Sequence, residues 1–189
     1  MRATWMVAGT ALAGALSLSG CSSAATRSSP TTNPRTTPDG SPGAVQLVDY
    51  TDNDGTKSTV VLTGAVGDYG HAVSVDANGK PDPEHRSQLE LALTRGTFRI
   101  SIAALDEQIV SAFRDFPPDR STCSGTVRVS GAAPIVAGGG TGAYREIHGR
   151  FNLTITIAEV DARSNCGPSS AFLSQAVVTA GSGTVSLRP

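Results

Sequence analysis

The sequence predicts an all-β fold, with eight to ten short antiparallel strands in one domain that covers residues 44–189. Apolar and polar residues alternate with a period of two in three separate segments, which is typical of strands with one buried face. Turn-forming residues separate the segments, and no window of about 11 residues shows a convincing helical stripe. Strands joined by short turns close into a barrel or pack as a sandwich.

The N-terminal segment, residues 1–20, is a short apolar stretch that precedes Cys21. Arg2 supplies a positive charge, residues 5–18 are apolar or small, and Leu18-Ser19-Gly20-Cys21 is similar to a lipobox. The segment therefore looks like a bacterial lipoprotein signal peptide. The apolar run is shorter than the about 20 residues of a transmembrane helix, so an uncleaved anchor is the weaker alternative. Lipidation of Cys21 would place at least two acyl chains on the new N-terminus, which is enough for stable anchoring. We therefore expect a lipid-anchored protein on the extracytoplasmic face of the cell membrane.

Residues 21–43 follow as a stalk. After Cys21 this stretch holds four prolines and ten serines or threonines, and its only aliphatic residues are alanines. Such a composition cannot bury a core, so the segment is expected to be disordered and to hold the folded domain away from the bilayer.

The domain begins after this stalk, and its strands can be placed from the alternation. The three clearest strands are predicted at residues 89–93, 98–102 and 151–157. Weaker ones are predicted at 45–50, 59–63, 71–75, 108–113, 126–130, 176–180 and 184–188. Asn53-Asp54-Gly55 and Asn78-Gly79 supply residues that tolerate positive φ in tight hairpins.

Two cysteines remain once Cys21 carries lipid. Cys123 and Cys166 form an even pair in an oxidising compartment, so we expect them to form a disulfide. Closing the loop between them would stabilise the fold by about 4 kcal/mol on the chain-entropy model. A metal or redox pair is the alternative, but no histidine constellation accompanies the two cysteines.

Charge and composition exclude several functions. The 15 Lys and Arg residues fall to 14 when Arg2 leaves with the signal peptide, and against 16 acidic residues the net charge becomes about −2. The basic residues are scattered, whereas a nucleic-acid partner requires them clustered. His71, His85 and His148 lack metal-ligand spacing, and no nucleophile elbow occurs. No catalytic residue, cofactor site or metal site is predicted.

Two weak candidates for an interior site remain. Tyr69 and His71 are two residues apart, so they share one face of a predicted strand and could point inward. Asp115, Asp119 and Arg120 flank a Phe-Pro-Pro segment that could line a barrel mouth.

The densest motif covers residues 138–149 and runs directly into the strand predicted at 151–157. A phosphate-binding glycine loop would need a helix at that point, so nucleotide binding is rejected. Glycines permit the tight connection, and the Tyr144 ring can fold under the end of a barrel. The motif resembles the G-G-T-G-x-[FY]-[KR]-x-A-x-G signature of the allene oxide cyclase and dirigent protein superfamily, although Ile147 replaces the usual alanine. The matching residues are Gly139, Gly140, Thr141, Gly142, Tyr144, Arg145 and Gly149.

The resemblance implies a closed barrel of about eight strands, an interior able to hold a small apolar molecule, and a tendency to form homo-oligomers. Three functions remain open because fold alone does not determine function. A carrier of a small apolar ligand predicts a cavity of about 300 Å³ or more. A cyclase or dirigent-type enzyme predicts at least two ionisable side chains that converge inside the barrel. A structural or interaction protein with a filled barrel predicts an exposed apolar patch or an oligomer interface.

Overall fold

A computed structural model describes residues 42–52, 58–82, 86–167 and 172–187. The predicted signal peptide, Cys21 and nearly all of the predicted stalk lie outside these residues. The Asn53-Asp54-Gly55 turn and His85 lie outside them as well.

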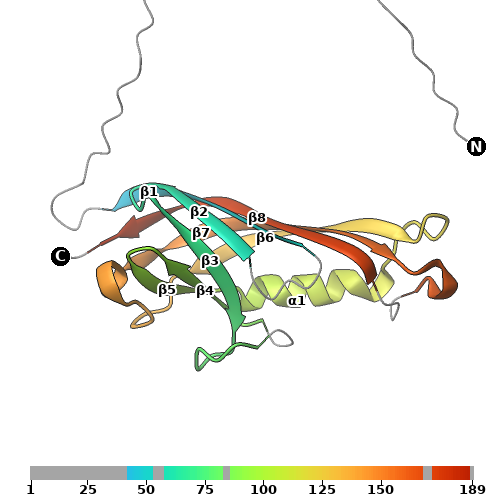
Figure 1. Cartoon of the computed structure of the whole chain (residues 1–189), viewed down its shortest axis with the longest axis horizontal. Coiled ribbons are helices and arrows are strands. Elements are labelled where there is room, and N and C mark those ends of the chain that lie inside the picture. Colours follow the sequence, from blue (N-terminus) through green and yellow to red (C-terminus); the bar gives the residue numbers. More distant parts are fainter. Residues whose placement is uncertain (1–41, 53–57, 83–85, 168–171, 188–189) are drawn as a thin grey trace, which may run out of the picture. The chain divides into compact units, whose positions relative to one another are not determined.

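The described residues form one antiparallel sheet of eight strands in the order β5-β4-β3-β2-β1-β8-β7-β6, which confirms the all-β prediction (Figure 1). The sheet curls into a half-barrel with its concave face inward. The strands are β1 (Gly43–Asp52), β2 (Ser58–Gly64), β3 (Asp68–Val75), β4 (Gln88–Leu93), β5 (Gly96–Ser101), β6 (Ser124–Pro134), β7 (His148–Asp161) and β8 (Phe172–Ser186).

The alternation in the sequence corresponds to the two faces of this sheet. In β2, Val60 and Leu62 are buried while Val61 between them is exposed. The same alternation along β7 buries Phe151, Leu153, Ile155 and Ile157. The inner face therefore carries the apolar core, as the period of two predicts.

The outer strands β5 and β6 meet only at one end. An isolated bridge joins Ile100 to Ile135, and the Val136 N–H donates to the Arg99 carbonyl at 2.8 Å. No ladder joins β5 to β6 in the described part of the sheet, which is why the architecture is a half-barrel.

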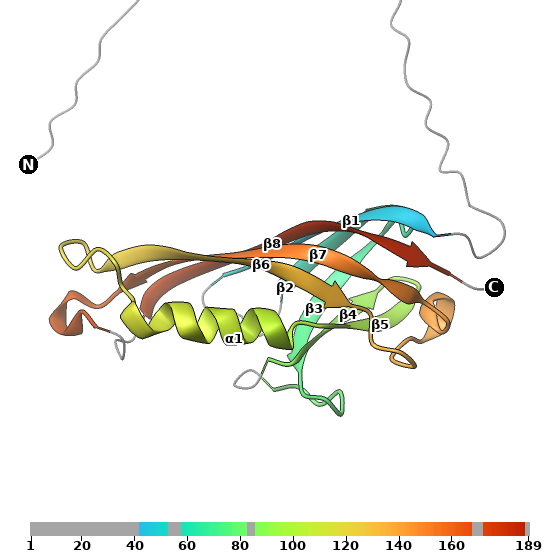
Figure 2. The ribbon, with the colours of Figure 1, turned by 180° about the vertical axis from the view of Figure 1, so that it is seen from behind.

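A helix lies against the concave side of the sheet, alongside β6 (Figure 2). The strand predicted at 108–113 is wrong, because these residues belong to α1 (Ala103–Ala112) and the 3-10 helix η1 (Phe113–Asp115). Leu105 is buried, and Ile109 and Phe113 pack on the core at four-residue spacing, which is a helical stripe. The helices in the described segments lack the length and apolarity needed to cross a membrane.

The helix can approach the sheet closely because Gly131 of β6 has no side chain. A Cβ atom added at Gly131 would lie 3.2 Å from Leu105 Cδ2. Leu105 therefore occupies the space that a larger residue in β6 would fill.

The two strands predicted at 176–180 and 184–188 form one continuous strand, β8. Gly181 and Gly183 between them suggest a turn, yet both pair with β7. A Cβ atom at Gly181 would lie 2.0 Å from the Asn152 carbonyl oxygen. These glycines allow close contact between two strands and do not reverse the chain.

The predicted disulfide is confirmed. Cys123 and Cys166 are bonded, with their Cα atoms 5.5 Å apart. The bond links the residue before β6 to the segment that follows β7 and the 3-10 helix η3 (Arg163–Asn165).

Candidate functional site

The glycine-rich motif anchors one end of the half-barrel. Tyr144, in the 3-10 helix η2 (Gly142–Tyr144), has an exposed fraction of 0% and packs edge-on against Phe98, with ring centroids 5.4 Å apart. Its hydroxyl donates a hydrogen bond to Asp68 Oδ2 at 2.5 Å. This position agrees with the expectation that the Tyr144 ring folds under the end of the sheet.

Asp68 is the partner that sequence reasoning missed. Its carboxylate also accepts hydrogen bonds from the Thr94 hydroxyl and from the backbone N–H groups of Tyr69 and Arg95. Burial raises the pKa of Asp68, but these donors together outweigh burial and hold the pKa well below its ordinary value. Burial and the hydrogen bond to Asp68 raise the pKa of the Tyr144 phenol. The hydrogen bond between Tyr144 and Asp68 therefore holds the motif against β3.

The other motif residues attach the motif to the turn between β4 and β5. The Thr141 hydroxyl accepts a hydrogen bond from the Thr97 N–H at 3.0 Å. A Cβ atom at Gly140 would lie 1.8 Å from the Tyr144 carbonyl oxygen, so only glycine fits there. Arg145 is exposed, and Gly139 and Gly149 flank the segment. The arrangement fits a structural motif.

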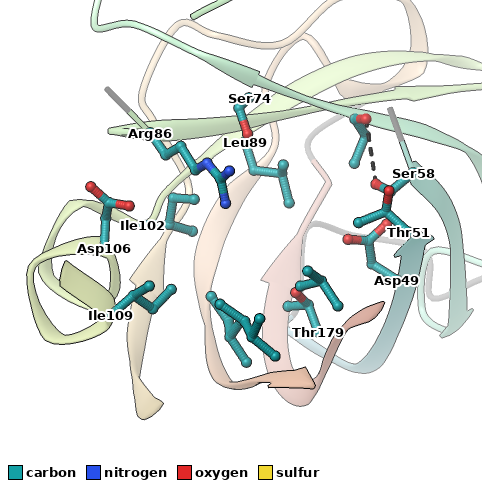
Figure 3. A pocket seen from close by; sticks show the side chains of 14 residues that line it. Asp49, Thr51, Ser58, Ser74, Arg86, Leu89, Ile102, Asp106, Ile109 and Thr179 are labelled. Carbon is teal, nitrogen blue, oxygen red and sulfur yellow. Dashed lines mark hydrogen bonds between the residues drawn. The ribbon is translucent and has the colours of Figure 1, made fainter. Parts of the chain in front are cut away.

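A pocket of about 50 Å³ lies on the concave face, toward the opposite ends of β3 and β4 from Tyr144 (Figure 3). Its volume is well below the 300 Å³ or more that the carrier hypothesis predicts. The apolar part of its wall comes from α1, β3, β4, β7, β8 and the residue before α1. These side chains are Ala72, Leu89, Ile102, Ile109, Ile155, Ile157 and Val177.

Asp49 is the polar centre of this pocket. It lies on the inner face of β1, where it pairs with Val60 on one side and Thr179 on the other. Its side chain is only 4% exposed, and its Oδ1 atom has no hydrogen-bond partner among the described residues. Burial raises the pKa of Asp49 from 3.8 to about 6, and hydrogen bonding to Ser58 opposes the rise. A group with such a pKa changes charge close to neutral pH.

Hydroxyl groups surround Asp49, and charged groups lie across the pocket. Thr51, Ser58 and Thr179 lie on the Asp49 side, whereas Arg86 and Asp106 lie on the opposite side (Figure 3). Three ionisable side chains therefore line one pocket.

The two interior candidates predicted from the sequence are wrong. Tyr69 is 64% exposed and His71 is exposed, because the inner positions of β3 are Asp68, Ala72 and Ser74. Two residues that are two apart do share a face, but this one is the outer face.

The residues around the Phe-Pro-Pro segment do not line the pocket either. Asp115, Asp119 and Arg120 are all exposed. Asp119 instead organises its own turn, where hydrogen bonds from Ser121 and Thr122 lower its pKa to about 2. Its position explains a stable loop and indicates no ligand site.

Two further acidic side chains, Glu159 and Asp161, lie outside the pocket on the inner face of β7. Asp161 is 2% exposed, its Oδ1 atom has no hydrogen-bond partner in the described part of the chain, and Glu159 receives a hydrogen bond from Gln175. Burial, with the neighbouring Asp161, raises the pKa of Glu159. The described residues contain no group of three or more His, Cys, Asp or Glu side chains that could hold a metal ion.

Asp49 carries a signal in the sequence that the predictions above did not use. The strand predicted at 45–50 buries Val45 and Leu47, so the same alternation places Asp49 on the buried face. An acidic residue at a buried strand position is unusual, since burying a carboxylate is costly.

Comparisons with protein-family models, with curated proteins and with solved structures found no match to this chain.

Proposed function

We propose that this chain is an extracytoplasmic lipoprotein, anchored through Cys21, whose half-barrel binds a small and largely apolar ligand. The lipobox-like sequence before Cys21 supports the anchor and the location at the cell membrane. The pocket supports the binding function.

The observation that carries the proposal is the composition of the pocket wall. Seven aliphatic side chains line the pocket together with a single buried carboxyl group whose Oδ1 atom lacks a partner among the described residues. Binding sites for small molecules combine an apolar wall with a few polar groups in this way. A cluster of buried apolar side chains forms most of the core elsewhere on the inner face.

The cavity volume limits how such a ligand sits. A space of about 50 Å³ is enough for roughly three to five water molecules, so it accommodates one end of a ligand and not a whole drug-sized molecule. The rest of the molecule would extend out of the pocket, next to the apolar side chains that α1 and β7 contribute to its wall.

The glycine-rich motif supports membership of the allene oxide cyclase and dirigent superfamily as part of this proposal. Tyr144 and its glycines hold the end of the sheet in the manner that a structural signature requires.

Native mass spectrometry of the protein purified from its own host tests the binding function. We expect a co-purifying molecule at a stoichiometric ratio, released on denaturation. Replacing Ser74, which lines the pocket, by Met should displace it, whereas the same change at the exposed outer residue Ser182 should not. An empty wild-type protein with an intact disulfide would contradict the proposal.

Substitution at Cys21 tests the anchor separately. A Cys21→Ala variant cannot be lipidated, so it should lose its lipid-modified N-terminal peptide and leave the detergent phase on phase partitioning. A variant that partitions with detergent as the wild type does would contradict the lipid anchor.

A surface interaction is the second candidate function, and a row of exposed apolar residues favours it. Tyr69, Val61 and Val48 are register neighbours across β3, β2 and β1 on the outer face of the sheet. Tyr50 and Val178 continue this outer row between β1 and β8. Contiguous exposed apolar patches mark interaction surfaces, including those of homo-oligomers. Sedimentation velocity should report a smaller species after Val61→Lys, and an unchanged monomer would dismiss self-association.

A cyclase or dirigent-type enzyme is the third alternative. The convergence of Asp49, Arg86 and Asp106 on one pocket provides the ionisable groups that this alternative requires. The mass-spectrometry experiment separates it from binding, since a catalyst would convert the released molecule when the two are incubated together.

A further inference from the structure

We infer that the ligand of this pocket is an aliphatic amine, whose protonated amino group enters first and binds Asp49. The inference rests on the proposed binding function and names the chemical class of the ligand. It follows from the partners that Asp49 lacks, from the groups around it and from the charge of the pocket.

Asp49 needs a hydrogen-bond donor. Its side chain is held on the inner face of β1 by strand pairing on both sides, so it cannot turn outward to water. An ionised carboxylate accepts hydrogen bonds and donates none, and a buried one without a partner is destabilising. A hydroxyl or an amine on a ligand would supply the donor that Oδ1 of Asp49 lacks among the described residues, in place of water that the pocket has room to hold.

The groups next to Asp49 favour an ammonium group over a hydroxyl. An ammonium has three donors, whereas a hydroxyl has one. Ser58 and Thr179 place hydroxyl oxygens on the same side of the pocket as Asp49, and each oxygen can accept a hydrogen bond. The single proton of the Ser58 hydroxyl can go to the Ala72 carbonyl, 3.4 Å away, or to Asp49, and in either case a lone pair of the hydroxyl oxygen remains for the ligand.

The charge of the pocket also selects a cation. Arg86 and Asp106 line the opposite side and carry opposite charges, so together they add no net charge. Asp49 then gives the ionised pocket a net charge of −1, which an ammonium neutralises and a carboxylate ligand repels. Charge-assisted hydrogen bonds of this kind are roughly twice as strong as neutral ones.

The apolar wall of the pocket determines the chemistry of the rest of the ligand. Ile102 and Ile109 face the pocket from the side of α1, and Ile155 and Ile157 from β7. These side chains offer no hydrogen-bonding group, so an alkyl chain fits next to them. A linear amine meets both requirements, with its amino group and the adjoining methylene groups in the cavity of about 50 Å³ and the rest of the chain extending out of it.

Three probes of equal chain length test the inference on the purified full chain: n-butylamine, n-butanol and sodium butyrate. At pH 7.5 the amine is protonated and the butyrate is ionised. Titrations are followed by the δ1-methyl NMR signals of isoleucines. Signals from Ile102, Ile109, Ile155 and Ile157 should shift, while that of Ile147, which does not line the pocket, should not. We expect butylamine to bind about tenfold more tightly than butanol, and butyrate not to bind.

Asp49→Asn is the matched variant, because it removes the charge and keeps the shape of the side chain. It should bind butylamine no more tightly than butanol. Asp115→Asn removes the same charge at an exposed position outside the pocket and should leave the preference for butylamine unchanged. The methyl spectrum of each variant reports whether it is folded.

The outcomes separate the two proposals. If none of the probes shifts the pocket isoleucines, the proposed binding function fails and the inference with it. If butanol or butyrate binds as tightly as butylamine, or if Asp49→Asn retains the preference, the pocket binds small molecules but the inference is overturned. The selectivity of the wild type decides this even if the variant does not fold.

Discussion

Replacing Asp49 by Asn should change how the stability of the protein depends on pH. Burial makes ionisation of Asp49 unfavourable in the folded state, where its pKa is about 6 against 3.8 ordinarily. Because the pKa of Asp49 is higher in the folded state than in the unfolded state, the protonated form of Asp49 stabilises the fold. This stabilisation is complete below pH 3.8 and is lost as pH rises through about 6. The pKa difference lowers the free energy of unfolding at pH 8 by about 3 kcal/mol relative to acid pH. About 2 kcal/mol of this loss occurs between pH 4 and pH 8.

The amide of the Asp49→Asn variant does not titrate, so the variant should lack this loss. Urea denaturation at fixed ionic strength, followed by circular dichroism between pH 4 and pH 8, measures the effect. The free energy of unfolding of the variant should gain about 2 kcal/mol relative to the wild type over this range. Any constant effect of the amide cancels in the comparison of slopes.

An exposed aspartate provides the control for this measurement. Asp115→Asn removes an exposed carboxylate and should give the same pH profile as the wild type. Arg86 and Asp106 also line the pocket and are present in every variant, so their contribution is common to the profiles that are compared. Parallel profiles for the wild type and Asp49→Asn would show that Asp49 is not desolvated, and the reasoning about the pocket would be refuted.

Two further predictions concern the motif. Tyr144→Phe removes one hydrogen bond to the buried Asp68 carboxylate and should lower the free energy of unfolding by about 1 to 3 kcal/mol, while Tyr69→Phe at an exposed position should leave it unchanged, as measured by urea denaturation. Equal effects of the two changes would contradict a stabilising hydrogen bond between Tyr144 and Asp68. Gly140→Ala forces a Cβ atom to within 1.8 Å of the Tyr144 carbonyl and should cost about 1 to 3 kcal/mol in a thermal melt. Gly167→Ala, where a Cβ atom meets nothing within 4 Å, is its control, and similar melting points for both would contradict the close packing.

Much of the fold could be predicted because alternation is a local property. Each strand reports its own buried face, so the strands that became β2, β4, β5 and β7 were visible without knowledge of their partners. The disulfide could be predicted because the expected lipidation of Cys21 leaves only one possible pairing between the two remaining cysteines.

The errors came from residues whose role depends on distant neighbours. The helical stripe of Leu105 and Ile109 is short, and its meaning depends on the sheet that it covers. Gly181 lies between two strands that the alternation predicts as separate, but the Asn152 carbonyl that requires glycine there is on another strand.

The sequence by itself determined that this is a β domain, where its buried faces lie, that it carries a disulfide, and that a glycine-rich motif precedes the longest alternation. Only the tertiary structure decided which polar residues became functional candidates. Tyr144 and Asp68 are 76 positions apart, and the pocket draws on six strands and a helix. The pKa of Asp49 depends on the side chains that exclude water from it, and only the packed fold brings those side chains together.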